Sequence, residues 1–226
     1  MKKQLMTLHM LDRLSADLSG LRAQNIPEWG WLWTVRKAIG LSAREVAGGR
    51  EISRQSIAAF ERGEAKGTIQ LGKLASVADV MGCQLVYTVS SFRPEILQRI
   101  KEVTDRRGGP PKVSDKEPPT PKYLEKSGMP SGGWLKRMRL SLGYSRAEVA
   151  AKVGVAPTTL RDLERSEAKG TITLNSLRRV ATALDCEVIY FLNNNGSVAP
   201  SFLNRMIPSP AEKKVASDSG KMMSDE

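Results

Sequence analysis

The chain of 226 residues is long enough for one or two domains, and its hydrophobic fraction of 40% is ordinary for a globular protein. Its formal net charge of +11 favours polyanionic partners, with nucleic acid ahead of acidic membranes and a merely solvated basic surface as the alternative. Because no run approaches about 18 apolar residues, composition excludes a membrane-spanning helix.

Catalytic signals are also missing from the sequence. His9 is the one histidine, so neither a His-based triad nor a histidine metal cluster can form, and no phosphate-binding loop or dinucleotide fingerprint occurs. We therefore expect a protein that is not an enzyme and that binds no cofactor and no metal. Cys83 and Cys186 are too few for a disulfide framework, which favours a cytoplasmic location and small buried thiols.

The first predicted element is an N-terminal helix within residues 1–29. Leucines recur there at helical spacing, for example at Leu5, Leu8, Leu11 and Leu14. This apolar stripe predicts a helix that packs on a neighbouring element. The more specific alternative is a helix that binds a toxin.

An internal repeat organises the rest of the chain. When residues 30–87 are set over residues 133–190 without a gap, 23 of the 58 positions are identical. The longest identical block is E-A-K-G-T-I, which begins at Glu64 and again at Glu167. The repeat predicts two related domains, at residues 30–91 and 133–195.

Two other segments complete the expected organisation. Residues 92–132 begin with a helical pattern over Pro94 to Arg107 and continue as a linker rich in proline and glycine. Residues 196–226 are polar and are expected to form a flexible tail.

The second repeat shows the expected elements most clearly. Helices are predicted over 134–142, over a stretch opened by a capping box at Ser145 and Glu148, over 158–165 and over 173–184. Gly154 suits the left-handed residue of the turn between the second and third helices, and C-E-V-I-Y-F-L reads as a strand. Two short helices joined by a glycine-containing turn predict a helix-turn-helix unit.

With these motifs, both repeats resemble Cro/C1-type helix-turn-helix domains of the XRE family. The most specific signal is the segment G-Y-S-R-A-E-V-A-A-K-V-G-V-A-P-T-T-L-R-D-L-E-R of the second repeat. The ending that runs from S-E-A-K-G-T-I-T-L to C-E-V-I-Y is similar to mobile mystery protein A and to HipB-like antitoxins. The resemblance implies a mainly α fold of two lambda-repressor-like domains, each ending in a β-strand.

The resemblance places base-reading side chains at the start of the third helix of each repeat. Arginine suits guanine and glutamine suits adenine, whereas threonine can contact thymine and aspartate can accept from cytosine. The two repeats differ most at these positions, which suggests two different half-sites, although unconstrained drift of exposed residues is the alternative. The candidate base contacts are Arg54, Gln55, Ser56, Ala59, Thr158, Thr159, Arg161 and Asp162.

Phosphate contacts are expected near the second helix and in the loop before the fourth. We also expect that loop to present free backbone amides at a helix N-terminus, although the identity of E-A-K-G-T in both repeats can equally reflect a turn requirement. The candidates are Arg44, Lys66, Thr68, Arg146, Lys169 and Thr171.

The resemblance further implies a structural ion pair in each repeat, between Arg36 and Glu61 and between Arg139 and Glu164. The first repeat departs from the family pattern at the turn between its second and third helices, where it has Glu51 in place of Gly154. Because glutamate is disfavoured in a left-handed conformation, this turn is expected to differ from that of the second repeat.

The two strands are expected to pair antiparallel within one chain, as a monomeric pseudo-dimer whose recognition helices lie about one DNA turn, ~34 Å, apart. Pairing between two chains, in a homodimer, is the alternative. The expected partner is a double-stranded DNA operator and not a membrane. The resemblance implies an autorepressing antitoxin with a cognate toxin such as a Fic-domain protein, and a mobile-element or phage regulator without a toxin is the alternative.

Overall fold

The computed structural model describes residues 26–48, 53–109, 129–130 and 132–194. Outside this part lie most of the N-terminal segment, the turn around Glu51, most of the linker and the tail. Both repeats, up to Asn193, belong to one compact unit.

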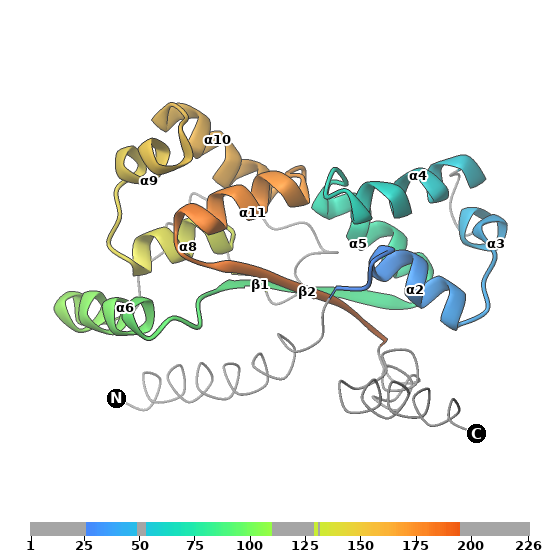
Figure 1. Cartoon of the computed structure of the whole chain (residues 1–226), viewed down its shortest axis with the longest axis horizontal. Coiled ribbons are helices and arrows are strands. Elements are labelled where there is room, and N and C mark those ends of the chain that lie inside the picture. Colours follow the sequence, from blue (N-terminus) through green and yellow to red (C-terminus); the bar gives the residue numbers. More distant parts are fainter. Residues whose placement is uncertain (1–25, 49–52, 110–128, 131, 195–226) are drawn as a thin grey trace, which may run out of the picture. The chain divides into compact units, whose positions relative to one another are not determined.

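The second repeat, here called module 2 (residues 133–194), consists of four helices and a strand (Figure 1). The helices are α8 (Trp134–Ser141), α9 (Arg146–Val153), α10 (Pro157–Ala168) and α11 (Leu174–Ala183), and β2 (Glu187–Asn194) follows. All five expected elements are present, with ends within a few residues of the prediction.

The turn between α9 and α10 forms as the sequence predicts. Ser145 and Glu148 make a reciprocal capping box at the start of α9, and Gly154 ends that helix in the left-handed region at φ 74°. Helix α10 is longer than expected at both ends. It begins at Pro157, because proline is favoured in the first turn, and it continues to Ala168 because Glu167 and Ala168 are buried.

The first repeat, here called module 1 (residues 30–90), has the same element order. Its helices are α2 (Gly30–Ala38), α3 (Ala43–Gly48), α4 (Arg54–Ala65) and α5 (Leu71–Val80), and β1 (Cys83–Ser90) follows. The mainly α fold with two repressor-like domains is therefore confirmed.

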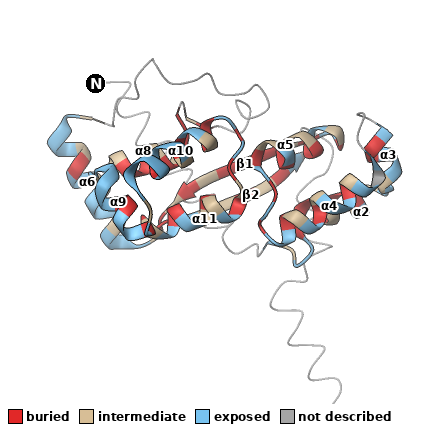
Figure 2. Ribbon diagram, turned by 90° about the horizontal axis from the view of Figure 1, so that it is seen from above, coloured by how far each residue is buried: buried red, intermediate tan, exposed pale blue. Residues whose placement is uncertain are grey.

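Strands β1 and β2 form one antiparallel two-stranded sheet (Figure 1). Pairing within one chain is thus the observed arrangement. Along β1 buried and half-buried residues alternate, and Tyr87 and Leu85 are among those that face the core. Figure 2 shows buried residues along both strands and on the inward sides of the helices. Cys83 and Cys186 are free thiols buried in this core, as expected.

Helix α6 (Pro94–Arg107) follows β1 and occupies the predicted span. Gly108 ends it at φ 69°. Although α6 follows module 1 in sequence, it packs on α8 of module 2, where Val103 is buried. Among the helices of the described residues, none has the length and apolarity needed to cross a membrane.

Candidate nucleic-acid interface

The start of α10 presents a polar face to solvent. Thr158, Thr159, Arg161 and Asp162 are all exposed, while Leu160 between them is fully buried and anchors the helix. Arg161 and Asp162 lie 3.7 Å apart as an exposed ion pair, which is worth little in water. All four base-contact candidates of module 2 therefore share one accessible surface.

The equivalent helix of module 1, α4, is opened by an N-cap. The Ser53 side chain accepts a hydrogen bond from the backbone N–H of Ser56 at 3.2 Å, and the two hydroxyls are 2.8 Å apart. Gln55 and Ala59 are exposed, whereas Ser56 is half-buried. The side chain of Arg54 lies outside the described residues.

Each module contains the ion pair that the resemblance implied. The Nε of Arg36 lies 2.5 Å from Oε1 of Glu61, and both side chains are about nine-tenths buried. The Nε of Arg139 lies 2.5 Å from Oε1 of Glu164, with both side chains at most 5% exposed. A second guanidinium nitrogen bonds the other carboxylate oxygen in each pair, so both contacts are bidentate.

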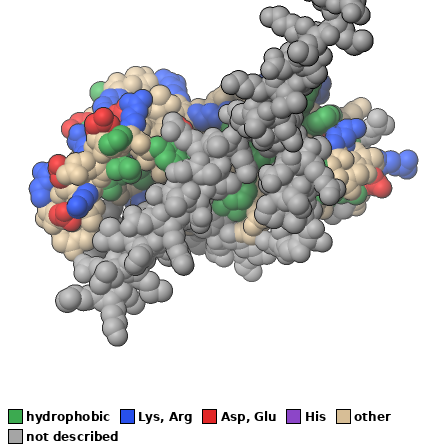
Figure 3. Space-filling model, turned by 60° about the horizontal axis from the view of Figure 1, so that its bottom comes forward, with side chains coloured by type: hydrophobic (Ala, Val, Ile, Leu, Met, Phe, Trp, Pro, Cys, Tyr) green, Lys and Arg blue, Asp and Glu red, His purple; other side chains and the backbone are tan. Residues whose placement is uncertain are grey.

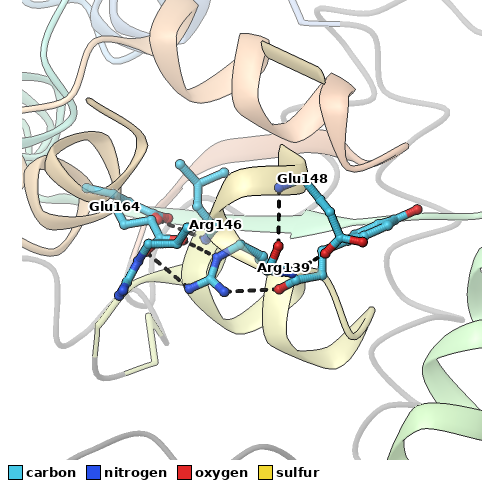
Figure 4. A network of polar contacts seen from close by, with 8 residues as sticks. Arg139, Arg146, Glu148 and Glu164 are labelled. Carbon is cyan, nitrogen blue, oxygen red and sulfur yellow. Dashed lines mark hydrogen bonds and ion pairs between the residues drawn. The ribbon is translucent and has the colours of Figure 1, made fainter. Parts of the chain in front are cut away.

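Arg146, a phosphate-contact candidate, also contacts this scaffold. Its Nε lies 3.3 Å from Oε2 of Glu164, and 44% of its side chain remains exposed. Figure 4 shows Arg139 and Arg146 converging on Glu164. The same arginine can therefore support α10 and still present donors to solvent.

The remaining phosphate candidates lie on exposed surface. The hydroxyls of Thr68 and Thr171 donate to backbone carbonyls in their own loops, at 3.4 and 3.3 Å. All five of these residues are exposed, namely Arg44, Lys66, Thr68, Lys169 and Thr171.

The expectation of free amides in the two E-A-K-G-T loops is wrong. The N–H of Leu71 donates to the carbonyl of Ile172 at 2.9 Å, and that of Leu174 donates to Ile69 at 3.1 Å. The N–H of Asn175 donates to Gly67 at 2.8 Å. The loops of the two modules therefore bond to each other, and these amides at the starts of α5 and α11 are occupied by the pairing rather than offered to an anion.

The glutamate of each E-A-K-G-T block is a buried helix cap. The carboxylate of Glu167 accepts from the backbone N–H groups of Trp134 and Leu135, both at 2.9 Å, and the carboxylate of Glu64 does the same at the start of α2. Each carboxylate thus accepts from two backbone N–H groups that have no acceptor within their own helix, and it interacts favourably with the helix dipole.

A tyrosine from the opposite module completes each cap. The hydroxyl of Tyr87 on β1 donates to Glu167 at 3.2 Å, and that of Tyr190 on β2 donates to Glu64 at 3.1 Å. The Tyr87 hydroxyl also lies 2.6 Å from the sulfur of Met129, a much weaker acceptor than a carboxylate. We refer to the pairs Tyr87–Glu167 and Tyr190–Glu64 as the Tyr–Glu lock, because each joins one module to the other.

Burial dominates the electrostatics of the lock. Desolvation raises the pKa of Glu167 to about 7, because the three hydrogen bonds to its carboxylate offset the loss of water only in part. Burial also raises the pKa of Glu64, where the nearby charge of Arg178 acts in the opposite direction. The two halves of the lock are therefore alike in geometry but differ in the charges nearby, which are that of Arg178 beside Glu64 and that of Glu164 beside Glu167.

The lock also explains two glycines that are identical in the repeats. A Cβ on Gly133 would lie 2.5 Å from Oε2 of Glu167, and one on Gly30 would lie 2.8 Å from Oε2 of Glu64. Sequence reasoning did not find the lock. Its signal was present, since glycine, glutamate and tyrosine recur together in both repeats while exposed positions differ.

Residues 135–191 match the helix-turn-helix family model. The match runs from within α8 to within β2 and supports a DNA-binding regulator of the XRE family rather than an enzyme. Neither the comparison with curated proteins nor that with solved structures finds a match. The match does not extend to module 1, whose likeness to module 2 rests on the repeat and on the shared order of elements.

Proposed function

We propose that the protein is a sequence-specific regulator that binds double-stranded DNA through both modules. The observation that carries this proposal is the exposed polar face of α10, held by the buried Arg139–Glu164 pair in a segment that matches the helix-turn-helix family. The second helix of such a unit enters the major groove. In module 1 the corresponding positions Gln55 and Ala59 are also exposed.

The basic surface supplies the nonspecific part of this binding. Lysines and arginines at exposed positions can neutralise phosphates, and their contribution falls steeply as salt concentration rises. Because the base-reading positions differ between α4 and α10, we propose that the two half-sites differ in sequence.

A mobility-shift titration with the upstream DNA of the gene, across a salt series, tests the proposal. Replacing Thr158 and Thr159 with alanine should weaken specific binding by a factor of about ten and leave nonspecific binding unchanged. Replacing Lys169 with alanine should weaken binding to all sequences and reduce the salt dependence. The matched control is Arg106→Ala, which removes one charge from α6. Absence of any selective binding by the unaltered protein would refute the proposal.

Binding-site selection with sequencing examines the asymmetry of the operator. We expect two half-sites of different sequence. A perfectly palindromic consensus would contradict the proposal that α4 and α10 recognise different bases. Swapping α10 residues 158–162 for their α4 counterparts should make the selected site more symmetric.

We further propose that the regulator is an antitoxin that represses its own operon. The likeness of the segment from E-A-K-G-T to C-E-V-I-Y to antitoxin regulators supports this role, and a toxin such as a Fic-domain protein is the proposed partner. Co-purification with the product of the adjacent gene, with relief of that product's toxicity, tests it. An adjacent integrase or conjugation gene instead would favour the regulator of a mobile element.

A further inference from the structure

Helix α6 crosses from module 1 to the helix-turn-helix of module 2. A Cβ on Gly143, just after α8, would lie 3.2 Å from Cγ2 of Val103, so glycine permits the helix to pack closely there. Arg107 donates to the carbonyl of Leu140 at 2.8 Å. Thus α6 covers the C-terminal end of α8, whose last carbonyls lack partners within the helix.

Arg99 of α6 makes several contacts at the corner between α8 and α9. Its Nε donates to the carbonyl of Leu142 at 2.9 Å, and its guanidinium lies 4.2 Å from the centre of the Tyr144 ring. Lys152 of α9 lies 4.3 Å from the same ring and donates to the Tyr144 hydroxyl at 3.1 Å. Two hydrogen bonds from Ser145 hold the pKa of Glu148 below its usual value, and the charge of Arg99 adds to this effect.

The same corner is connected to α10. The backbone carbonyl of Tyr144 accepts from Arg139 at 3.1 Å, and the other nitrogens of Arg139 bind Glu164 of α10. Figure 4 shows Arg139 between this corner and Glu164. A continuous set of contacts therefore runs from Arg99 through Tyr144 and Arg139 to the proposed recognition helix.

Module 1 lacks the aromatic part of this arrangement, because Leu41 stands where module 2 has Tyr144. At the end of the molecule that carries α6, Figure 3 shows basic and acidic side chains around a few apolar ones. This mixed surface is not the uniformly basic one that phosphate binding by α6 itself would favour.

We propose that Arg99 is a positioning residue for DNA recognition by module 2, in that it fixes the α8–α9 corner from which Arg139 holds α10. The inference rests on the proposed DNA binding, and it predicts an effect confined to one half-site. A contribution of Arg99 to overall stability alone would affect both half-sites alike.

The test compares Arg99→Ala, Arg99→Lys and Arg106→Ala on the selected operator and on a version with the module 2 half-site scrambled. Arg106 is a matched control, since it lies on the same helix and its Nε donates within that helix, to Glu102. Arg99→Ala should weaken binding to the intact operator by a factor of about ten and leave binding to the scrambled one unchanged. Lysine should not restore affinity, because it lacks the planar group that stacks on Tyr144.

Equal losses on both operators, no loss on either, or full rescue by lysine would each overturn the proposal. Hydrogen–deuterium exchange provides a readout without DNA. In Arg99→Ala the amides of α10 should exchange faster while those of α4 stay unchanged, and unchanged exchange in α10 would overturn the proposal. If the unaltered protein selects no DNA, the proposed function fails, while exchange still decides whether Arg99 positions α10.

Discussion

Replacing Tyr87 with phenylalanine is the most direct way to weaken the contact between the modules. The change removes a single oxygen, so the ring still packs among buried residues. Glu167 keeps its two backbone donors but loses the third, which comes from the other module. Because hydrogen bonds to a buried charged group contribute about 1.5–3 kcal/mol, a loss of about 2 kcal/mol in unfolding free energy is expected.

The loss of unfolding free energy should depend on pH and should differ between the two halves of the lock. Glu167, with a pKa of about 7, is largely ionised at pH 8 and largely protonated at pH 6, so the loss should be greater at pH 8. Tyr190→Phe should cost less, since the charge of Arg178 still stabilises the carboxylate of Glu64.

Urea unfolding followed by circular dichroism measures these differences. Tyr144→Phe is the control, because its hydroxyl bonds Lys152 at the exposed surface and its removal should change stability by at most about 0.5 kcal/mol. If Tyr87→Phe costs no more than Tyr144→Phe at pH 8, the lock does not stabilise the contact between the modules.

Three further predictions concern the scaffold. Arg139→Met should destabilise the protein by about 3–5 kcal/mol in urea unfolding, because it removes the buried bidentate partner of Glu164 and leaves only the half-exposed Arg146 beside that carboxylate. Loss of the exposed Arg93–Asp185 pair in Asp185→Asn should cost at most about 1 kcal/mol, and similar costs for the two changes would contradict this reasoning. Since the pKa of Glu167 rises from 4.5 to about 7 on folding, its contribution to stability is full below pH 4.5 and is lost as pH rises through 7, by on the order of 3 kcal/mol. Glu167→Gln should flatten that slope, and an unchanged slope would point to another group. Light scattering should give the monomer mass of 24.8 kDa, and twice that mass would favour pairing between chains.

Local features of the fold were predictable because they depend on neighbours in sequence. The capping box at Ser145 and the left-handed Gly154 follow from residue types within a single turn. Similarly, the regular spacing of apolar residues located α6 over its full length.

Features that depend on distant partners could not be predicted in the same way. A pattern of residues indicates which amides a helix leaves without partners, but not that Leu71 will find Ile172 in the other repeat. The docking of α6 on α8 likewise depends on the three-dimensional arrangement of both modules. Identity between the repeats was the one signal for the lock, since Glu64 and Glu167 recur with their glycines and tyrosines.

The reciprocal form of the Tyr–Glu lock has an evolutionary consequence. In a homodimer a change to one reading surface is copied into both subunits, so the recognised site stays symmetric. Once two copies share a chain, each surface can drift independently, whereas Glu64, Tyr87, Glu167 and Tyr190 cannot, because each cap contains one residue from each copy. After gene duplication, the lock residues would therefore be preserved while the exposed recognition surfaces diverge. The two repeats now show this pattern, because they are identical at the lock and differ at the recognition positions.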